Sequence, residues 1–66
     1  MNIKYKKVFM EMSKRKERIE HLAVLLGVSG VTVRNKLSGI SEWNISEIRE
    51  LCTHYRMTFE ELFDEK

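Results

Sequence analysis

The apolar residues of the chain fall into five groups, each spaced like one face of a helix. These groups are Tyr5, Val8, Phe9 and Met12; Ile19, Leu22, Ala23 and Leu26; Val33 and Leu37; Ile48, Leu51, Cys52 and Tyr55; and Phe59, Leu62 and Phe63. They predict helices over roughly residues 3–13, 18–26, 29–38, 45–55 and 59–64. The sequence indicates no strand, repeat or low-complexity segment, so these faces can be buried only against each other. We therefore expect an all-α, compact five-helix fold forming a single domain over residues 1–66.

Residues with capping side chains mark where several of these helices begin. Asn2 is a candidate N-cap for the first helix. Trp43 lies just before the fourth helix, where a hydrophobic staple would let it close the core; stacking on a base is the alternative. Two capping-box patterns follow, Asn44 with Glu47 and Thr58 with Glu61.

The second and third helices, about residues 18–26 and 29–38, are joined by a very short turn. Gly27 ends the first of them, because glycine adopts the left-handed conformation at little cost. Val28 is apolar and suited to fill the angle between the helices, and Ser29 offers an oxygen to the N–H groups of the next helix. Two helices joined in this way match a helix-turn-helix over about residues 18–38.

The third helix buries little of its own surface. Only Val33 and Leu37 are expected in the core, and Gly39 closes the helix. A helix of this kind has a face free to meet base edges and phosphates. That face carries small, polar or basic residues: Gly30, Val31, Thr32, Arg34, Asn35, Lys36 and Ser38.

Charge is divided unevenly along the chain. Residues 1–39 hold nine Lys and Arg against three acids, and residues 40–66 hold three against seven, so the halves carry +6 and −4 within the net +2. A polyanionic partner of the basic half explains this polarity, and two solvated faces of opposite sign are the alternative. The charged segment 13–18 has the same two interpretations, a phosphate-facing cluster or a solvated connector.

Several other classes of protein are disfavoured. No run of about 18 apolar residues is present, so we expect no membrane span. The single Cys52 cannot form an internal disulfide, and we expect it to be a reduced core thiol in a cytoplasmic protein. His21 and His54 lie on different predicted helices, and no catalytic, metal-binding or phosphate-loop motif accompanies them. We therefore expect no enzyme activity, metal, cofactor or small-molecule ligand.

The central residues also resemble a known family. The stretch from Leu22 to Gly39 reads Leu22-Ala23-x-x-Leu26-Gly27-Val28-Ser29-x-x-Thr32-Val33-x-x-x-Leu37-x-Gly39. It resembles the Cro/C1-type (XRE-like) helix-turn-helix family of phage repressors and related bacterial regulators. The ending over residues 57–63 resembles that family too, so the likeness covers about residues 3–63. It implies a lambda-repressor-like fold and sequence-specific binding of double-stranded DNA to control transcription, with the third helix in the major groove.

The resemblance also implies particular contacts. The residues carried over to base edges are Gly30, Val31, Thr32, Arg34 and Asn35, and those carried over to phosphates are Arg18, Ser29, Lys36, Ser38 and Ser41. Arg18 and Ile19 replace the capping hydroxyl and the glutamine that are common in the family, so the second helix should lack its cap. Gly30 and Val31 replace glutamines, which predicts few polar base contacts. Val31 or Thr32 would then meet thymine methyls and Asn35 would read adenine, with any remaining specificity from DNA shape.

The resemblance further implies a homodimer, because tight binding by so small a domain normally needs two half-sites about 34 Å apart. The region of the fourth and fifth helices holds apolar residues that either form a partner surface or belong to the core: Trp43, Tyr55, Met57 and Phe63. A protein-interaction module of the antitoxin or anti-repressor type is the alternative function. The sequence leaves open the operator, repression or activation, phage or host origin, and whether the chain is a headpiece of a longer protein.

Overall fold

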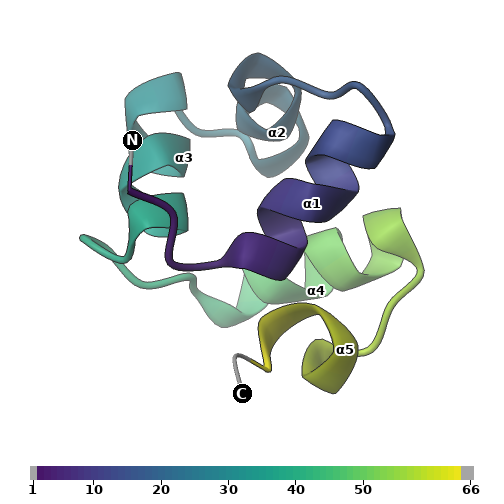
Figure 1. Cartoon of the computed structure of the whole chain (residues 1–66). Helices are drawn as coiled ribbons and strands as arrows, with labels where there is room; N and C mark the ends of the chain where they lie inside the picture. The colour runs from purple at the N-terminus through teal and green to yellow at the C-terminus, as the bar shows by residue number, and fades with distance from the viewer. Residues whose placement is uncertain (1, 65–66) are drawn as a thin grey trace.

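The computed structural model describes residues 2–64, and within them the chain forms five helices and no strand (Figure 1). The helices are α1 (Lys6–Lys14), α2 (Ile19–Leu26), α3 (Gly30–Ser38), α4 (Ile45–Tyr55) and α5 (Phe59–Phe63). The expected all-α, five-helix fold is confirmed. Helix α2 packs closely on α3, and α1 contacts both α3 and α5, so the short turn between α2 and α3 fits a helix-turn-helix.

The N-terminal segment differs most from the prediction. Helix α1 begins at Lys6 rather than near residue 3, and Tyr5, not Asn2, occupies its N-cap position without a side-chain bond. The reason is that the backbone N–H groups of residues 4 and 5 bind α3 instead of starting α1. The N–H groups of Lys4 and Tyr5 both donate to the carbonyl oxygen of Leu37, at 2.9 and 3.2 Å. Residues 4 and 5 therefore cap the C-terminal end of α3.

Capping side chains fix the starts of α3, α4 and α5 as predicted. Ser29 Oγ accepts from the Thr32 N–H at 3.1 Å, and Asn44 Oδ1 accepts from the Glu47 N–H at 2.8 Å. The capping box at the start of α5 also forms, between Thr58 and Glu61. Each cap satisfies N–H groups that the first turn of a helix leaves without partners.

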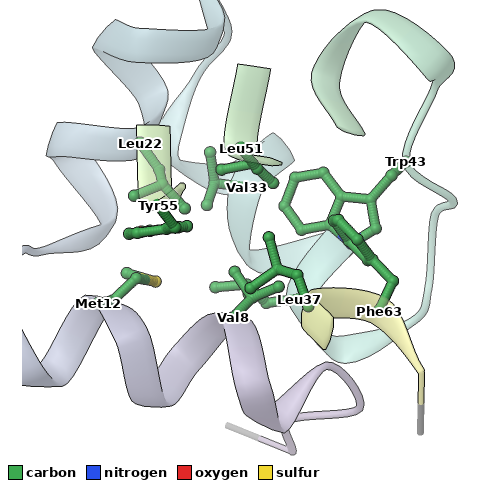
Figure 2. Packing of buried hydrophobic residues seen from close by; sticks show 10 residues of the cluster. Val8, Met12, Leu22, Val33, Leu37, Trp43, Leu51, Tyr55 and Phe63 are labelled. Carbon is green, nitrogen blue, oxygen red and sulfur yellow. The ribbon is translucent and has the colours of Figure 1, made fainter. Parts of the chain in front are cut away.

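The core lies where α1 faces the other four helices (Figure 2). Val8 and Met12 point from α1 into it, one helical turn apart. Phe9, which the periodicity placed on the same face, is exposed instead, because Val8 and Met12 define the buried line of α1 and Phe9 lies at its edge. The buried hydrophobic residues are Val8, Met12, Leu22, Val33, Leu37, Trp43, Leu51, Tyr55, Leu62 and Phe63.

Trp43 closes this core, as expected, and is 8% exposed. Its ring meets Tyr5 and Phe63 edge-on, with centroids 6.1 and 6.2 Å away. Tyr5 and Phe63 also meet edge-on, at 5.9 Å, so the three rings form a closed triangle. Such pairs favour edge-to-face geometry because the ring edge is positive and the face negative. The triangle joins the N-terminal segment, the loop before α4 and the end of α5.

Polar contacts tie the turn between α1 and α2 to the end of α4. Glu17 Oε1 accepts from the Tyr55 hydroxyl at 2.7 Å, and its Oε2 lies 2.6 Å from His54 Nε2. Arg15 donates to the carbonyl oxygens of His54 and Tyr55 and lies over the Tyr55 ring. Arg15 and Glu17 therefore join this charged segment, residues 13–18, to α4. Neither of the two interpretations of the segment, a phosphate-facing cluster or a solvated connector, anticipated this.

Candidate nucleic-acid interface

The angle between α2 and α3 is set by three consecutive residues. Gly27 has φ +69°, in the left-handed region that favours glycine. The Val28 N–H donates to the Ala23 carbonyl oxygen at 3.0 Å, and its side chain packs on the core. Ser29 then caps α3. The chain thus reverses within a few residues and presents α3 beside α2, as Figure 1 shows.

Helix α3 has one buried line and one open face. Val33 and Leu37 are fully buried, as predicted, and no other residue of α3 is. Val31 and Arg34 are exposed, and Asn35 is half-buried. Val31 and Asn35 lie four residues apart and so share one side of the helix.

An open groove of about 610 Å³ runs beside this face. It is bounded by the N-terminal segment, the start of α2 and the loop after α3; the lining residues are Asn2, Ile19, Arg34, Asn35, Ser38 and Ile40. Asn2, Ile19 and Ile40 were absent from the predicted site. Ile40 lies in a loop, where no periodicity indicates which way a side chain points, so the sequence held no signal for it.

The residues predicted to meet bases differ in how free their side chains are. Within residues 2–64 the Arg34 guanidinium and the Asn35 amide make no hydrogen bond or ion pair, so both remain available to a ligand. The Thr32 hydroxyl is 2.9 Å from Ser29 Oγ and belongs to the cap. Gly30 is half-buried beside Ile19.

The residues predicted to meet phosphates are mostly engaged within the domain. Ser29 Oγ serves the cap of α3, and Ser38 Oγ donates to the Asn35 carbonyl oxygen at 3.1 Å. The half-buried Ser41 donates its N–H to the same carbonyl oxygen at 3.2 Å. Arg18 is exposed at the start of α2, and its guanidinium makes no hydrogen bond or ion pair within the described chain.

The sequence predicted that α2 would lack its N-terminal cap, and the structure corrects this in part. Arginine cannot accept a hydrogen bond, so Arg18 provides no side-chain cap. His21 Nδ1, however, accepts from the backbone N–H of Arg18 at 3.0 Å. This is the reciprocal half of a capping box, supplied by histidine in place of glutamate.

Comparison with known protein families matches residues 8–66 to the BetR domain. The chain belongs to the BetR domain family. The family comprises small helical domains of a DNA-binding type. No curated protein and no solved structure matches the chain. No helix within residues 2–64 is long and apolar enough to cross a membrane. Among the same described residues, no group of three or more His, Cys, Asp or Glu side chains could hold a metal ion.

Lys36, which the resemblance assigns to a phosphate, is engaged within the domain. Its ammonium pairs with the Glu47 carboxylate, and the two side chains are only 12% and 5% exposed. Glu47 also accepts from the Asn44 N–H at 3.0 Å, so the pair is part of the capping box of α4. In this BetR domain Lys36 therefore positions α3 against the start of α4, and its charge points away from the open face.

The sequence left open whether the apolar residues near α4 and α5 form a partner surface or belong to the core. Trp43, Tyr55 and Phe63 belong to the core, and Met57 is half-buried. The exposed apolar side chains of α4 and α5 are Ile45 and Phe59. A cavity of about 250 Å³ opens beside Phe59 and is lined by Tyr5, Glu42, Trp43, Ile48, Phe59 and Phe63.

Cys52 is half-buried, not fully buried as the sequence indicated. Burial raises the pKa of its thiol, which favours the protonated, unreactive form. Cys52 therefore behaves as a packing residue at the edge of the core.

Replacing Gly30 with alanine would test whether Gly30 belongs to a DNA interface without disturbing the fold. The new Cβ would meet only Ile19 Cγ2, at an ordinary van der Waals distance of 3.6 Å. We expect thermal unfolding to show equal or greater stability, by up to about 1 kcal/mol, because alanine is the better helix former. We expect weaker DNA binding, because the methyl would separate the start of α3 from the base edges. Unchanged affinity would remove Gly30 from the interface.

Proposed function

We propose that this BetR domain is a sequence-specific transcriptional regulator of the Cro/C1 type that binds double-stranded DNA with α3 in the major groove. The observation that carries the proposal is the open face of α3. Two residues of this helix are fully buried, Val31 and Arg34 are exposed, and Arg34 and the half-buried Asn35 line the groove. The basic first half of the chain and the DNA-binding type of the family support it. The proposal assigns no catalytic role and places the protein in the cytoplasm with its DNA.

The proposed phosphate contacts follow from which groups are free. Arg18 offers an exposed guanidinium at the N-terminal end of α2, where the helix dipole also favours an anion. Ser29, Ser38 and Ser41 stay in the proposed set through the resemblance, although each already has a hydroxyl or N–H group engaged within the domain. Lys36 is left out of this set because its ammonium is held by Glu47.

We further propose that the protein binds DNA as a homodimer. One copy exposes few polar groups on α3, so specific binding needs a second half-site about one helical turn away. Ile45 and Phe59 are exposed, and Phe59 lines the aromatic cavity, so these side chains are suited to the contact between copies.

The test is binding to random-sequence duplex DNA at several salt concentrations, together with selection of preferred sites from that pool. We expect affinity to fall steeply with salt, because phosphate contacts release counterions. An enriched palindrome would support the dimer, and its half-site spacing would give the distance between the two α3 helices. A single enriched half-site would contradict the dimer. Absence of binding at low salt would overturn the proposal.

Asn35→Ala tests the placement of α3 on the bases. We expect about a tenfold loss of affinity for the selected site, confined to one base position, because asparagine can contact adenine N6 and N7 together. Competition binding with singly substituted duplexes measures this effect. An equal loss on unrelated DNA would show that Asn35 does not read a base.

An interaction module, of the antitoxin or anti-repressor type, is the second candidate. The exposed Phe59 beside an aromatic cavity is the observation that favours it. Such a module would bind a protein tightly and show no salt-dependent DNA binding, so the experiment above separates the two.

A further inference from the structure

The cavity beside Phe59 gathers four of the six aromatic residues of the chain. Its volume is about 250 Å³, and its lining residues are Tyr5, Glu42, Trp43, Ile48, Phe59 and Phe63. They come from the N-terminal segment, the loop before α4, and helices α4 and α5. The proposed contacts with bases and phosphates use none of these residues.

Three of the lining rings stand at steep angles to each other. The planes of Tyr5, Trp43 and Phe63 meet pairwise at angles between 69° and 76°, with centroids 5.9–6.2 Å apart. Figure 2 shows Trp43 and Phe63 meeting at one end of the core. Phe59 adds a fourth ring, which is 56% exposed and stacks on Phe63 at 5.5 Å. One cation can therefore lie within about 6 Å of several centroids, the range in which the negative ring faces attract it.

The charge around the cavity also favours a cation. Glu42 is exposed and makes no hydrogen bond or ion pair within the described residues. Residues 40–66, which provide five of the six lining residues, hold seven acids against three bases. The domain already contains one contact of this kind, because Lys4 Nζ lies 5.4 Å from the Tyr5 centroid without lining the cavity. The cavity therefore complements a positive charge.

The polar groups of the cavity distinguish between kinds of cation. A primary ammonium carries three N–H donors, whereas the side-chain acceptors among the lining residues are the Glu42 carboxylate and the Tyr5 hydroxyl. A quaternary ammonium has no N–H group to satisfy. The Trp43 indole N–H is a buried donor without a partner in residues 2–64, and buried donors are normally paired. An oxygen on the bound compound would supply the missing acceptor.

We propose that this cavity binds a small quaternary ammonium compound that also carries an oxygen acceptor. The methylated nitrogen lies against the aromatic rings, Glu42 provides the counter-charge, and the oxygen accepts from the Trp43 indole N–H. The proposal departs from the expectation that the chain has no small-molecule ligand. The lining residues are spread between positions 5 and 63 and form no motif, so the sequence held no signal for this site.

Choline is the probe for this site. The matched neutral control is its carbon isostere, in which a tert-butyl group replaces the trimethylammonium group. Proton–nitrogen correlation NMR follows the Trp43 indole N–H while each compound is added at constant ionic strength. We expect choline to shift this signal and to bind about tenfold more tightly than the isostere, which lacks the cation–π attraction. Equal affinity of the two compounds, or no shift with choline, would overturn the proposal.

Tetramethylammonium tests the oxygen of the bound compound. It keeps the cation and lacks the acceptor, so it should bind about threefold more weakly than choline. Affinity equal to that of choline would remove the Trp43 N–H from the site.

Three variants test the location of the site. Phe59→Leu removes a ring and keeps an apolar side chain, so it should weaken choline binding about threefold. Glu42→Gln removes the counter-charge and should weaken it about twofold. Ile45→Ala is the matched control, because Ile45 is 70% exposed on α4 and does not line the cavity. All three side chains are exposed, so the thermal midpoint should stay that of the parent. Choline binding unchanged in both Phe59→Leu and Glu42→Gln would overturn the assignment to this cavity.

A second copy of the chain seated on Phe59 is the competing occupant. It would make the Trp43 signal shift with protein concentration in the absence of choline, together with a dimer in sedimentation. A dimer of this kind that choline does not enter would overturn the ligand site. DNA binding measured on the same samples is a separate readout, so failure of the ligand site leaves the proposed function standing.

Discussion

Glu47→Ala should destabilise the domain by about 3 kcal/mol. The substitution leaves the Lys36 ammonium in a site where its side chain is only 12% exposed and has lost its counter-charge. Removing one partner of a buried pair typically costs about 3–5 kcal/mol, because the remaining charge stays desolvated. The lower end applies here since Lys36 keeps some contact with water. Denaturant unfolding followed by helical circular dichroism measures the effect.

Three further variants separate the ion pair from the helix cap. Glu47→Gln keeps the oxygen that accepts from the Asn44 N–H and loses the charge, so it reports on the pair alone. Glu61→Ala removes the same capping pattern from α5, where the side chain is exposed. It should lower the free energy of unfolding much less than Glu47→Ala does. Lys36→Met combined with Glu47→Gln should recover part of the loss, because no buried charge remains. If the double variant instead loses as much free energy of unfolding as Lys36→Met and Glu47→Gln lose together when made singly, the two side chains are not paired.

The same pair bears on DNA binding. A lysine that contacts a phosphate contributes about one unit to the dependence of log affinity on log salt. Lys36→Met should leave that slope unchanged, because its ammonium is directed at Glu47 and not at the open face of α3. Arg18→Ala should reduce the slope. The opposite result would return Lys36 to the phosphate-contacting set.

Glu17→Ala should have the second largest effect on stability and lower the free energy of unfolding by roughly 2–3 kcal/mol. It leaves the buried Tyr55 hydroxyl and the His54 ring without their acceptor. A hydrogen bond to a charged group is worth about 1.5–3 kcal/mol, and the His54 contact should add little to this because its side chain is 33% exposed and water screens it. It also releases the turn between α1 and α2 from α4. Denaturant unfolding at neutral pH measures this loss, and Tyr55→Phe, which removes one of the two bonds, should cost less.

The contribution of Glu17 should depend on pH in a defined direction. Partial burial raises the pKa of this carboxyl, but the hydrogen bonds from His54 and Tyr55, with the charges of His54 and Arg15, outweigh it, so the folded-state pKa is lowered. A lowered carboxyl pKa adds stability above the unfolded-state pKa, about 4.3, which disappears as the pH falls through the folded-state value. Stability of the parent should therefore fall below about pH 4 more steeply than that of Glu17→Gln. Parallel curves would contradict the role of the charge.

The arrangement of helices was predictable from local patterns, and the polar contacts between helices were not. The bounds of α4 and the caps at Ser29 and Asn44 depend on neighbours within four residues, and the sequence predicted them closely. The pair of Lys36 with Glu47 spans 11 residues, and the contacts of Glu17 with α4 span 37 and 38. Spacing along one helix cannot indicate which charged side chain another helix will receive.

The same distinction explains the candidate site. The open face of α3 followed from its thin apolar line: Val31 and Arg34 are exposed and Asn35 is half-buried, and their contacts with bases stay a prediction. Lys36 is only one position from Asn35, yet it turns toward α4, because the capping carboxylate there lies within reach. Ile40 lines the groove from the loop after α3, where no periodicity indicates the direction of a side chain.

The aromatic triangle of Tyr5, Trp43 and Phe63 gives the protein an internal optical reporter. Trp43 is the only tryptophan in the sequence, so all indole fluorescence comes from one buried position. Its emission should shift to longer wavelength as soon as the N-terminal segment or α5 leaves the loop before α4, because water then reaches the ring. Comparing that signal with the helical content would show whether these two ends detach before the helices melt, without attaching any dye.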